Sequence, residues 1–294
     1  MKLGMIGLGK MGANMAERLR RADHEVVGFD PHAEGSAVDS LEALAEALAG
    51  ADQPRIAWSM VPAGAVTDQT ITTLAGLFGE GDLVIDGGNS HYPDSVRRGE
   101  ILAAKGIHFI DAGTSGGVWG LQNGYALMVG GSDEAVALAQ PIFDALAPPE
   151  NGFGHVGPVG AGHFTKMVHN GIEYGIMQAY AEGYAVLLKS PLGVDALAAI
   201  KSWQQGSVVR SWLLDLLVAA LDDDPGLDDI LPVAVDSGEG RWTVEAAIET
   251  GVAAPVISAA LFARFVSQDD RGTAMRVVSA LRHQFGGHAI EMKP

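Results

Sequence analysis

A short segment of the sequence, KMVHNGIEY at residues 166–174, carries five side chains that commonly do chemistry or bind ligands. They are an amine, an imidazole, an amide, a carboxylate and a phenol, from Lys166, His169, Asn170, Glu173 and Tyr174. At about 3.6 residues per turn these positions fall on one face of an α-helix, and the residues between them are apolar. A polar stripe on an otherwise apolar helix is typical of a buried helix whose stripe lines a cavity. We therefore expect these five side chains to face a ligand.

These residue types suit the oxidation of an alcohol that lies β to a carboxylate. Lys166 can take the hydroxyl proton while a hydride leaves for a nicotinamide, provided that burial keeps its amine neutral beforehand. The protonated amine would then stabilise the enolate oxygen as the β-keto acid loses CO₂. Glu173, two turns away on the same face, can return a proton to the carbon that lost CO₂. The sequence shows no cluster of metal-binding carboxylates, so we expect no metal.

The cofactor that such chemistry needs is indicated by the segment GLGKMG at residues 7–12, which fits G-x-G-x-x-G. It follows an apolar run and opens a helical pattern, the context in which glycines and a helix N-terminus bind a pyrophosphate. Asp30 ends the next apolar run, about 20 residues further on, where a carboxylate binds the ribose hydroxyls of NAD and repels the 2′-phosphate of NADP. NAD is therefore favoured, with NADP as the alternative. The expected cofactor-binding residues are Gly7, Leu8, Gly9, Met11, Gly12, Asp30, Val61, Pro62 and Asn89.

The elements that must position these residues alternate between strand and helix up to about residue 157. Short apolar runs predict strands at 3–6, 25–29, 56–58, 83–85, 107–110 and 125–129, and helical patterns predict helices at 11–21, 41–49, 67–78, 93–105 and 133–146. This alternation predicts a parallel sheet covered on both faces. Polar, glycine-rich segments at 59–62, 86–90 and 111–117 follow three of the strands, so we expect them to face the same crevice as the glycine turn.

From Gly160 onward the strand signal disappears and helical patterns continue to the end of the chain. We place the domain change in the Gly- and Pro-rich segment Asn151–Gly162. The predicted fold class is α/β, with a Rossmann-type dinucleotide-binding domain at 1–158 followed by an all-α substrate and oligomerisation domain at 159–294. The helix with the polar stripe would open the second domain.

The composition sets limits on partners and location. The formal net charge of −17 argues against nucleic acid and anionic membranes as partners, because both are bound through clustered Lys and Arg. The chain has no cysteine and begins with an apolar run too short for a signal peptide or a membrane span, so we expect a cytoplasmic protein. An anionic small ligand would need a locally basic pocket.

The segments GLGKMG, DGGNS, DAGTSGG and KMVHNGIEYG, with FGGH near the C-terminus, resemble those of decarboxylating 6-phosphogluconate dehydrogenases. The resemblance covers essentially the whole chain. It is to the shorter bacterial and archaeal branch, because the longer enzymes carry a duplicated helical region that this chain lacks. Related 3-hydroxyacid dehydrogenases usually carry two adjacent asparagines where this chain has His169-Asn170.

The resemblance implies Lys166 as general base and Glu173 as general acid in converting 6-phospho-D-gluconate to ribulose 5-phosphate and CO₂. It implies a set of residues for the phosphorylated sugar acid, namely Asn89, Ser115, Gly116, Gly117, His169, Asn170, Tyr174, Arg264, Arg282 and His288. In the longer enzymes the C-terminal tail reaches across from the partner subunit. The resemblance therefore implies a homodimer or homotetramer, with Arg282 and His288 near a neighbouring active site.

One departure affects the phosphate end of this site. The family's Lys before a Gly-Lys-Trp-Thr segment corresponds to Ser237 in DSGEGRWT, where Arg241 is either a compensating cation or a surface residue. Two other functions remain open from the residues alone. One is a non-decarboxylating NAD-dependent 3-hydroxyacid dehydrogenase, against which Glu173 and the cations Arg264, Arg282 and His288 speak. The other is a nucleotide-sensing regulatory protein, which we would expect to have lost Lys166 or Glu173.

Overall fold

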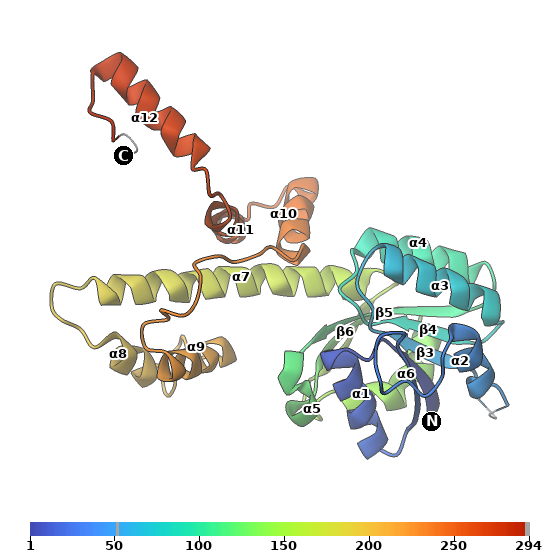
Figure 1. The fold of residues 1–294 in the computed structure, drawn as a ribbon. Helices are drawn as coiled ribbons and strands as arrows, with labels where there is room; N and C mark the ends of the chain where they lie inside the picture. The colour runs from blue at the N-terminus through green and yellow to red at the C-terminus, as the bar shows by residue number, and fades with distance from the viewer. Residues whose placement is uncertain (51–52, 292–294) are drawn as a thin grey trace. The chain divides into compact units, whose positions relative to one another are not determined.

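The structure of the protein is a computed structural model that describes residues 1–50 and 53–291 (Figure 1). The chain divides into two compact units, Met1–His169 and Asn170–Pro294. The first contains all the described strands, and the second is helical. This arrangement confirms the predicted α/β class with a helical C-terminal part.

The first unit contains a seven-stranded sheet in the order β2-β1-β3-β4-β5-β6-β7. Its strands are β1 (Lys2–Ile6), β2 (Glu25–Phe29), β3 (Ile56–Ser59), β4 (Leu83–Asp86), β5 (His108–Ser115), β6 (Ala126–Gly130) and β7 (Phe153–Gly157). Its helices are α1 (Lys10–Arg21), α2 (Leu41–Leu48), α3 (Ala65–Leu77), α4 (Tyr92–Ala103), the 3-10 turn η1 (Gly117–Trp119), α5 (Gly120–Asn123) and α6 (Asp133–Leu146). The chain order reverses between β1 and β3, which is where open α/β sheets bind ligands.

Both faces of the sheet are covered because successive side chains along each strand point to opposite sides. Met5 and Trp58 pack into one core with α1 and α6, whereas their neighbours Ile6 and Ala57 pack into another with α2, α3 and α4. Figure 1 shows α3 and α4 on one side of the sheet and α1 on the other. Strands buried on both faces read as continuous apolar runs, which is why the sequence located the first five of them.

The end of the sheet differs from the predicted all-parallel arrangement. β6 pairs antiparallel with β5, because η1 and α5 connect them through too short a segment for a crossover back to the start of the sheet. The strand β7 was not predicted, and it lies inside the segment 151–162 that we expected to be a linker. Its sequence FGHVG combines two glycines with a half-exposed edge position, so it lacks the apolar run of the other strands.

The remaining helices are α7 (Ala161–Leu188), α8 (Ala196–Ser202), α9 (Trp212–Asp223), α10 (Glu239–Thr250), α11 (Pro255–Ser267) and α12 (Thr273–Gly286). α7 is one continuous helix that begins in the first unit and continues into the second. The described residues of the second unit bury two small apolar clusters, one around Tyr174 with Ala260 and Leu261 and one around Ile200 with Leu214. None of the residues of α12 is buried.

Candidate functional site

The glycine turn between β1 and α1 has the backbone geometry that a dinucleotide site requires. Gly7 has φ +87°, and a Cβ there would lie 2.6 Å from the carbonyl oxygen of Met60. A Cβ on Gly12 would lie 2.0 Å from the carbonyl oxygen of Gly7, so α1 packs against the turn only because this position is glycine. Gly9, by contrast, faces open space and caps α1 without a side-chain hydrogen bond. The first N–H groups of α1 are thus suited to an anion such as a pyrophosphate.

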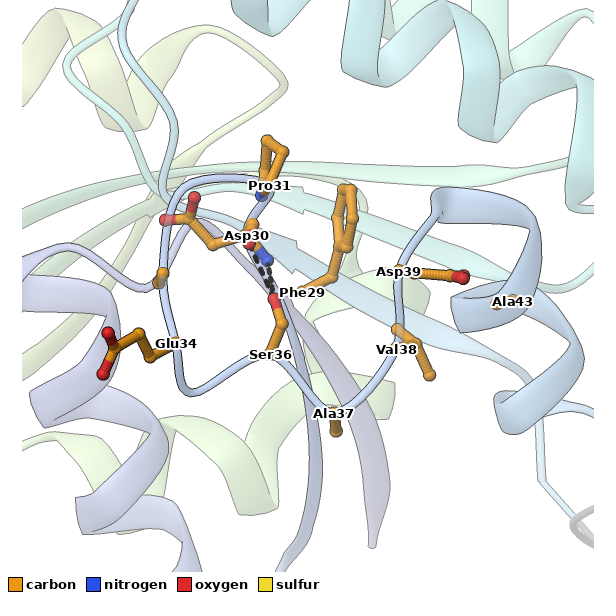
Figure 2. Close-up of a pocket in the computed structure, with 10 residues that line it drawn as sticks. Phe29, Asp30, Pro31, Glu34, Ser36, Ala37, Val38, Asp39 and Ala43 are labelled. Atoms are coloured by element: carbon orange, nitrogen blue, oxygen red, sulfur yellow. Dashed lines mark hydrogen bonds between the residues drawn. The ribbon is translucent and has the colours of Figure 1, made fainter.

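Asp30 joins the end of β2 to this glycine turn. Its Oδ2 accepts a hydrogen bond from the backbone N–H of Leu8 at 2.8 Å, and its Oδ1 accepts one from the N–H of His32 at 2.8 Å. The backbone of Asp30 is held in turn by the hydroxyl of Ser36, which donates to the carbonyl oxygen at 2.7 Å and accepts from the N–H at 2.6 Å (Figure 2). The carboxylate is therefore fixed beside the turn, at the place where the ribose of a dinucleotide is bound.

A pocket of about 760 Å³ opens beside Asp30, between the end of β2 and the start of α2. Figure 2 shows the loop after Asp30 curving around it. The described residues that line it include three with carboxyl groups, Asp30, Glu34 and Asp39, and none of them is Lys or Arg. A 2′-phosphate entering this pocket would meet negative charge, which fits NAD better than NADP.

The loop after β4 is held by a buried network around Asp86. The Asp86 carboxylate accepts hydrogen bonds from the Ser90 hydroxyl at 2.7 Å and from the fully buried Arg98 guanidinium at 3.2 Å. Asn89 is the exposed residue between these buried neighbours. Val61 is half-buried and Pro62 exposed in the loop that follows the carboxyl end of β3.

The loop after β5 turns through two consecutive glycines. Gly116 has φ +144° and Gly117 has φ +53°, both in the region that favours glycine. Ser115 is the last residue of β5 and is half-buried. The structure therefore places Ser115, Gly116 and Gly117 together, where β5 ends and η1 begins.

Lys166 is buried, with 7% of its surface exposed, on the second turn of α7. Its backbone lies against β5, since a Cβ on Gly113 would come within 2.4 Å of the Lys166 Cβ. Two residues earlier on the same face of β5, the buried carboxylate of Asp111 accepts hydrogen bonds from the N–H groups of Gly160 at 2.6 Å and His163 at 2.7 Å. The start of α7 is thereby fixed to the sheet, and burial raises the pKa of Asp111.

His163 lies one turn before Lys166 and is also buried. Its Nδ1 forms a hydrogen bond with the Ser95 hydroxyl of α4 at 2.7 Å. The sequence did not indicate Ser95 or Asp111 as partners of His163. Together these contacts hold the first turn of α7 against two other elements of the first unit.

In the second unit, Tyr174 of α7 contacts the predicted phosphate residue Arg264 of α11. The Arg264 Cζ lies 3.4 Å from the centre of the Tyr174 ring, and its Nη1 donates to the Val235 carbonyl oxygen at 2.9 Å. The Tyr174 hydroxyl lies 3.1 Å from the hydroxyl of Ser237, the residue in place of the family's Lys. Ser237 in turn donates to the buried Glu239 at 2.6 Å, a carboxylate that the sequence analysis did not single out.

Other predicted residues of the second unit are placed differently. Arg241 pairs with Asp236 at 2.9 Å and lies over the ring of Phe265, so it is engaged on the surface. Arg282 is exposed on α12, and His288 is exposed just after its end. His169, Asn170 and Glu173 are half-buried along α7.

The described residues contain no group of three His, Asp or Glu side chains arranged to hold a metal ion. Among the helices of the same part of the chain, none is long and apolar enough to cross a membrane.

The fold and the glycine turn thus define a Rossmann-type dinucleotide-binding protein with a helical C-terminal part. Comparison with known families narrows this class. Residues 2–157 match the model of the NAD binding domain of 6-phosphogluconate dehydrogenase, and residues 162–293 match that of the 6-phosphogluconate dehydrogenase C-terminal domain. The chain therefore belongs to the 6-phosphogluconate dehydrogenase family.

Individual relatives agree with this assignment and with the short form. A Bacillus subtilis protein provisionally named a 6-phosphogluconate dehydrogenase is 44% identical, with 100% of both chains covered. The NAD(+)-dependent, decarboxylating 6-phosphogluconate dehydrogenase of Haloferax volcanii is 42% identical over 100% of this chain and 99% of its own. The solved Plasmodium falciparum 6-phosphogluconate dehydrogenase, described in complex with NADP+ and with 6-phosphogluconate, is 29% identical with a TM-score of 0.82, covering 100% of this chain and 67% of that one.

Proposed function

We propose that the protein catalyses the oxidative decarboxylation of 6-phospho-D-gluconate to D-ribulose 5-phosphate and CO₂, with reduction of NAD. The observation that carries this proposal is the burial of Lys166, on a helix turn fixed to β5 in the unit that holds the glycine turn. A lysine on a surface helix normally extends its amine into solvent, whereas the Lys166 side chain is buried. A buried amine suits a base for the substrate hydroxyl. The names of the relatives support the same substrate and reaction.

A bound NAD would supply the acceptor for the hydride that leaves carbon 3 of the substrate. The residues that would hold it fit this role, because Gly9 leaves the first turn of α1 open and Asp30 is fixed beside it. Lys166 removes the proton of the 3-hydroxyl and, once protonated, stabilises the enolate oxygen during loss of CO₂. Glu173 then protonates carbon 1 of the enediol. Asn89, Ser115, Gly116, Gly117, His169 and Asn170 are the proposed ligands of the sugar-acid carboxylate and hydroxyls.

The reaction is tested by measuring NADH and CO₂ together when the purified protein is given 6-phospho-D-gluconate. One CO₂ for each NADH is the expected result. NADH without CO₂ would instead support a non-decarboxylating 3-hydroxyacid dehydrogenase. Binding of NAD without turnover of any sugar acid would support the regulatory alternative.

Replacing Asp30 by alanine is expected to weaken NAD binding by about tenfold, because two ribose hydrogen bonds to a charged acceptor are lost. NADP binding should weaken less or improve, since the charge that repels the 2′-phosphate is removed. The measurement is KM for both cofactors at saturating 6-phospho-D-gluconate. Glu34→Gln, which changes a second carboxylate of the same pocket, is the matched comparison. An equal loss for both cofactors would contradict the proposed basis of NAD preference.

We further propose that the protein is a homodimer or homotetramer in which Arg282 and His288 bind the phosphate in a neighbouring subunit. The exposed apolar side chains of α12 support this, since Met275, Leu281 and Phe285 are each more than half exposed in the single chain. Light scattering of the purified protein should give a mass of at least a dimer. Arg282→Ala should raise KM for 6-phospho-D-gluconate. A fully active monomer would contradict the proposal that Arg282 and His288 act in a neighbouring subunit.

Two other expectations remain proposals. A domain boundary at residues 158/159 is supported by the two family models, which leave 158–161 between them. Cytoplasmic location is supported by the metabolic substrate proposed here.

A further inference from the structure

The guanidinium of Arg264 is held in place by groups of its own unit. Its Cζ lies 3.4 Å from the centre of the Tyr174 ring, a cation–π contact, and its Nη1 donates to the carbonyl oxygen of Val235. Its Nε and Nη2 form no hydrogen bond with the described residues. The guanidinium is thus oriented while part of its donor fork stays available to an anion.

Tyr174 is itself tightly placed. Its side chain is 4% exposed and packs with Ala260 and Leu261. A Cβ on Gly240 would lie 2.4 Å from the ring, so the ring occupies space that only glycine leaves free. The position of the ring determines where Arg264 can stack.

The hydroxyl of Tyr174 is oriented by a chain of hydrogen bonds with a defined direction. Ser237 Oγ donates to Glu239 Oε2 at 2.6 Å. The Ser237 oxygen is then available to accept from the Tyr174 hydroxyl at 3.1 Å, while the Ser237 N–H donates to the Tyr174 oxygen at 3.3 Å. In this arrangement the Tyr174 hydroxyl is held from two sides by Ser237.

Glu239 would be unfavourable beside a phosphate unless it had another role. It is 3% exposed, and among the described residues it forms no ion pair. A buried carboxylate costs free energy, and its charge opposes a nearby phosphate. This cost is offset if the Glu239 carboxylate positions a group whose attraction for the phosphate exceeds the repulsion between the carboxylate and the phosphate.

We propose that Ser237 and Glu239 are positioning residues for Arg264, acting through Tyr174, so that a hydrogen-bonded relay takes the place of the family's Lys at the phosphate end. The relay consists of Glu239, Ser237 and Tyr174. This inference rests on the proposed function, in which Arg264 binds the substrate phosphate. Its consequence is that the strength of phosphate binding depends on two residues that do not touch the phosphate.

Ser237→Ala removes the middle hydroxyl of the relay. The expected result is a rise of about 3- to 10-fold in KM for 6-phospho-D-gluconate and in the inhibition constant of inorganic phosphate, the range of one lost hydrogen bond. The kcat and the KM for NAD should stay within about twofold, because no group at the reacting carbons changes. Ser237→Thr keeps the hydroxyl at an exposed position and should restore the wild-type constants. Ser202→Ala, on exposed α8, is the matched control.

Glu239→Gln and Glu239→Ala test the end of the relay. The Gln amide oxygen can still accept from Ser237, so phosphate binding should stay within about threefold of wild type, whereas Glu239→Ala should behave like Ser237→Ala. Wild-type phosphate affinity in both alanine variants would overturn the proposal. Equal losses of phosphate affinity in the alanine variants and in Ser237→Thr and Glu239→Gln would also overturn it. So would losses in kcat and in NAD affinity as large as the loss in phosphate affinity.

Binding of inorganic phosphate to the same variants, measured by calorimetry without NAD, separates this inference from the proposed function. If the wild type binds phosphate but does not oxidise 6-phospho-D-gluconate, the proposed function fails. The phosphate affinities of the variants then still test the relay. If it turns over the substrate and the variants bind phosphate unchanged, only the relay fails.

Discussion

Replacing Lys166 by alanine is expected to lower kcat by about 10²- to 10⁴-fold, the usual contribution of a general base or acid. The loss should lie toward the upper end, because the same amine is proposed to act twice, as a base and then as the cation that stabilises the enolate. Steady-state kinetics with NAD and 6-phospho-D-gluconate provide the measurement. NAD should still bind with nearly wild-type affinity, since the glycine turn and Asp30 belong to other elements.

Lys166→Arg separates the two roles of the amine. Arginine keeps a positive charge but stays protonated, so it cannot take the hydroxyl proton. This variant should therefore lose hydride transfer nearly as completely as Lys166→Ala. Lys189→Ala removes an exposed lysine at the end of the same helix and should leave kcat unchanged. Activity of Lys166→Ala within tenfold of wild type would remove Lys166 from the mechanism.

The sequence predicted the first strands and the glycine turn of the first unit well, because their signals are local. The strands β1 to β5 are buried apolar runs bounded by turns, and the glycine turn joins the first strand to the first helix directly. The reversal of β6 and the strand β7 were missed, because they depend on the length of a connection and on pairing at a sheet edge. Neither leaves a clear periodicity in the chain.

The residues that support the site were harder to predict than those proposed to act in it. Asp111 was recognised only as part of a strand-end turn, although its carboxylate fixes the start of α7 by accepting from residues 49 and 52 positions away. Glu239 lies within the segment identified as a departure from the family, yet its link to Tyr174 joins positions far apart in the chain. Such contacts follow from tertiary packing, which helical spacing along α7 does not encode.

Helical spacing also gave an incomplete account of the burial of α7. Lys166 and Tyr174 are buried as expected for the polar stripe, but the nearby apolar residues Ile172 and Ile176 are 51% and 38% exposed. A helix surrounded by protein would bury both its polar and its apolar positions. The exposed isoleucines therefore add to the exposed apolar side chains of α12 in supporting the proposed assembly of more than one chain.

Replacing Glu173 by glutamine is expected to lower kcat by about 10²- to 10³-fold while the preceding steps are retained. Glutamine has nearly the same shape and can still form hydrogen bonds, but it cannot donate a proton to carbon 1. Because protonation is the last chemical step, a first turnover that forms NADH and CO₂ should still occur in the variant. Rapid-mixing measurement of NADH should then show a burst followed by slow release of the enediol.

The source of the final proton gives a second measurement for the same variant. In D₂O, protonation by Glu173 should place one deuterium at carbon 1 of ribulose 5-phosphate on a single face. An enediol released from Glu173→Gln would be protonated by water on either face, so the product should lose this stereochemical purity. Glu182→Gln, on an exposed turn of the same helix, should keep both the rate and the stereochemistry. A stereospecific product from Glu173→Gln would assign the final proton to another residue, because only a group fixed in the site can deliver it to one face.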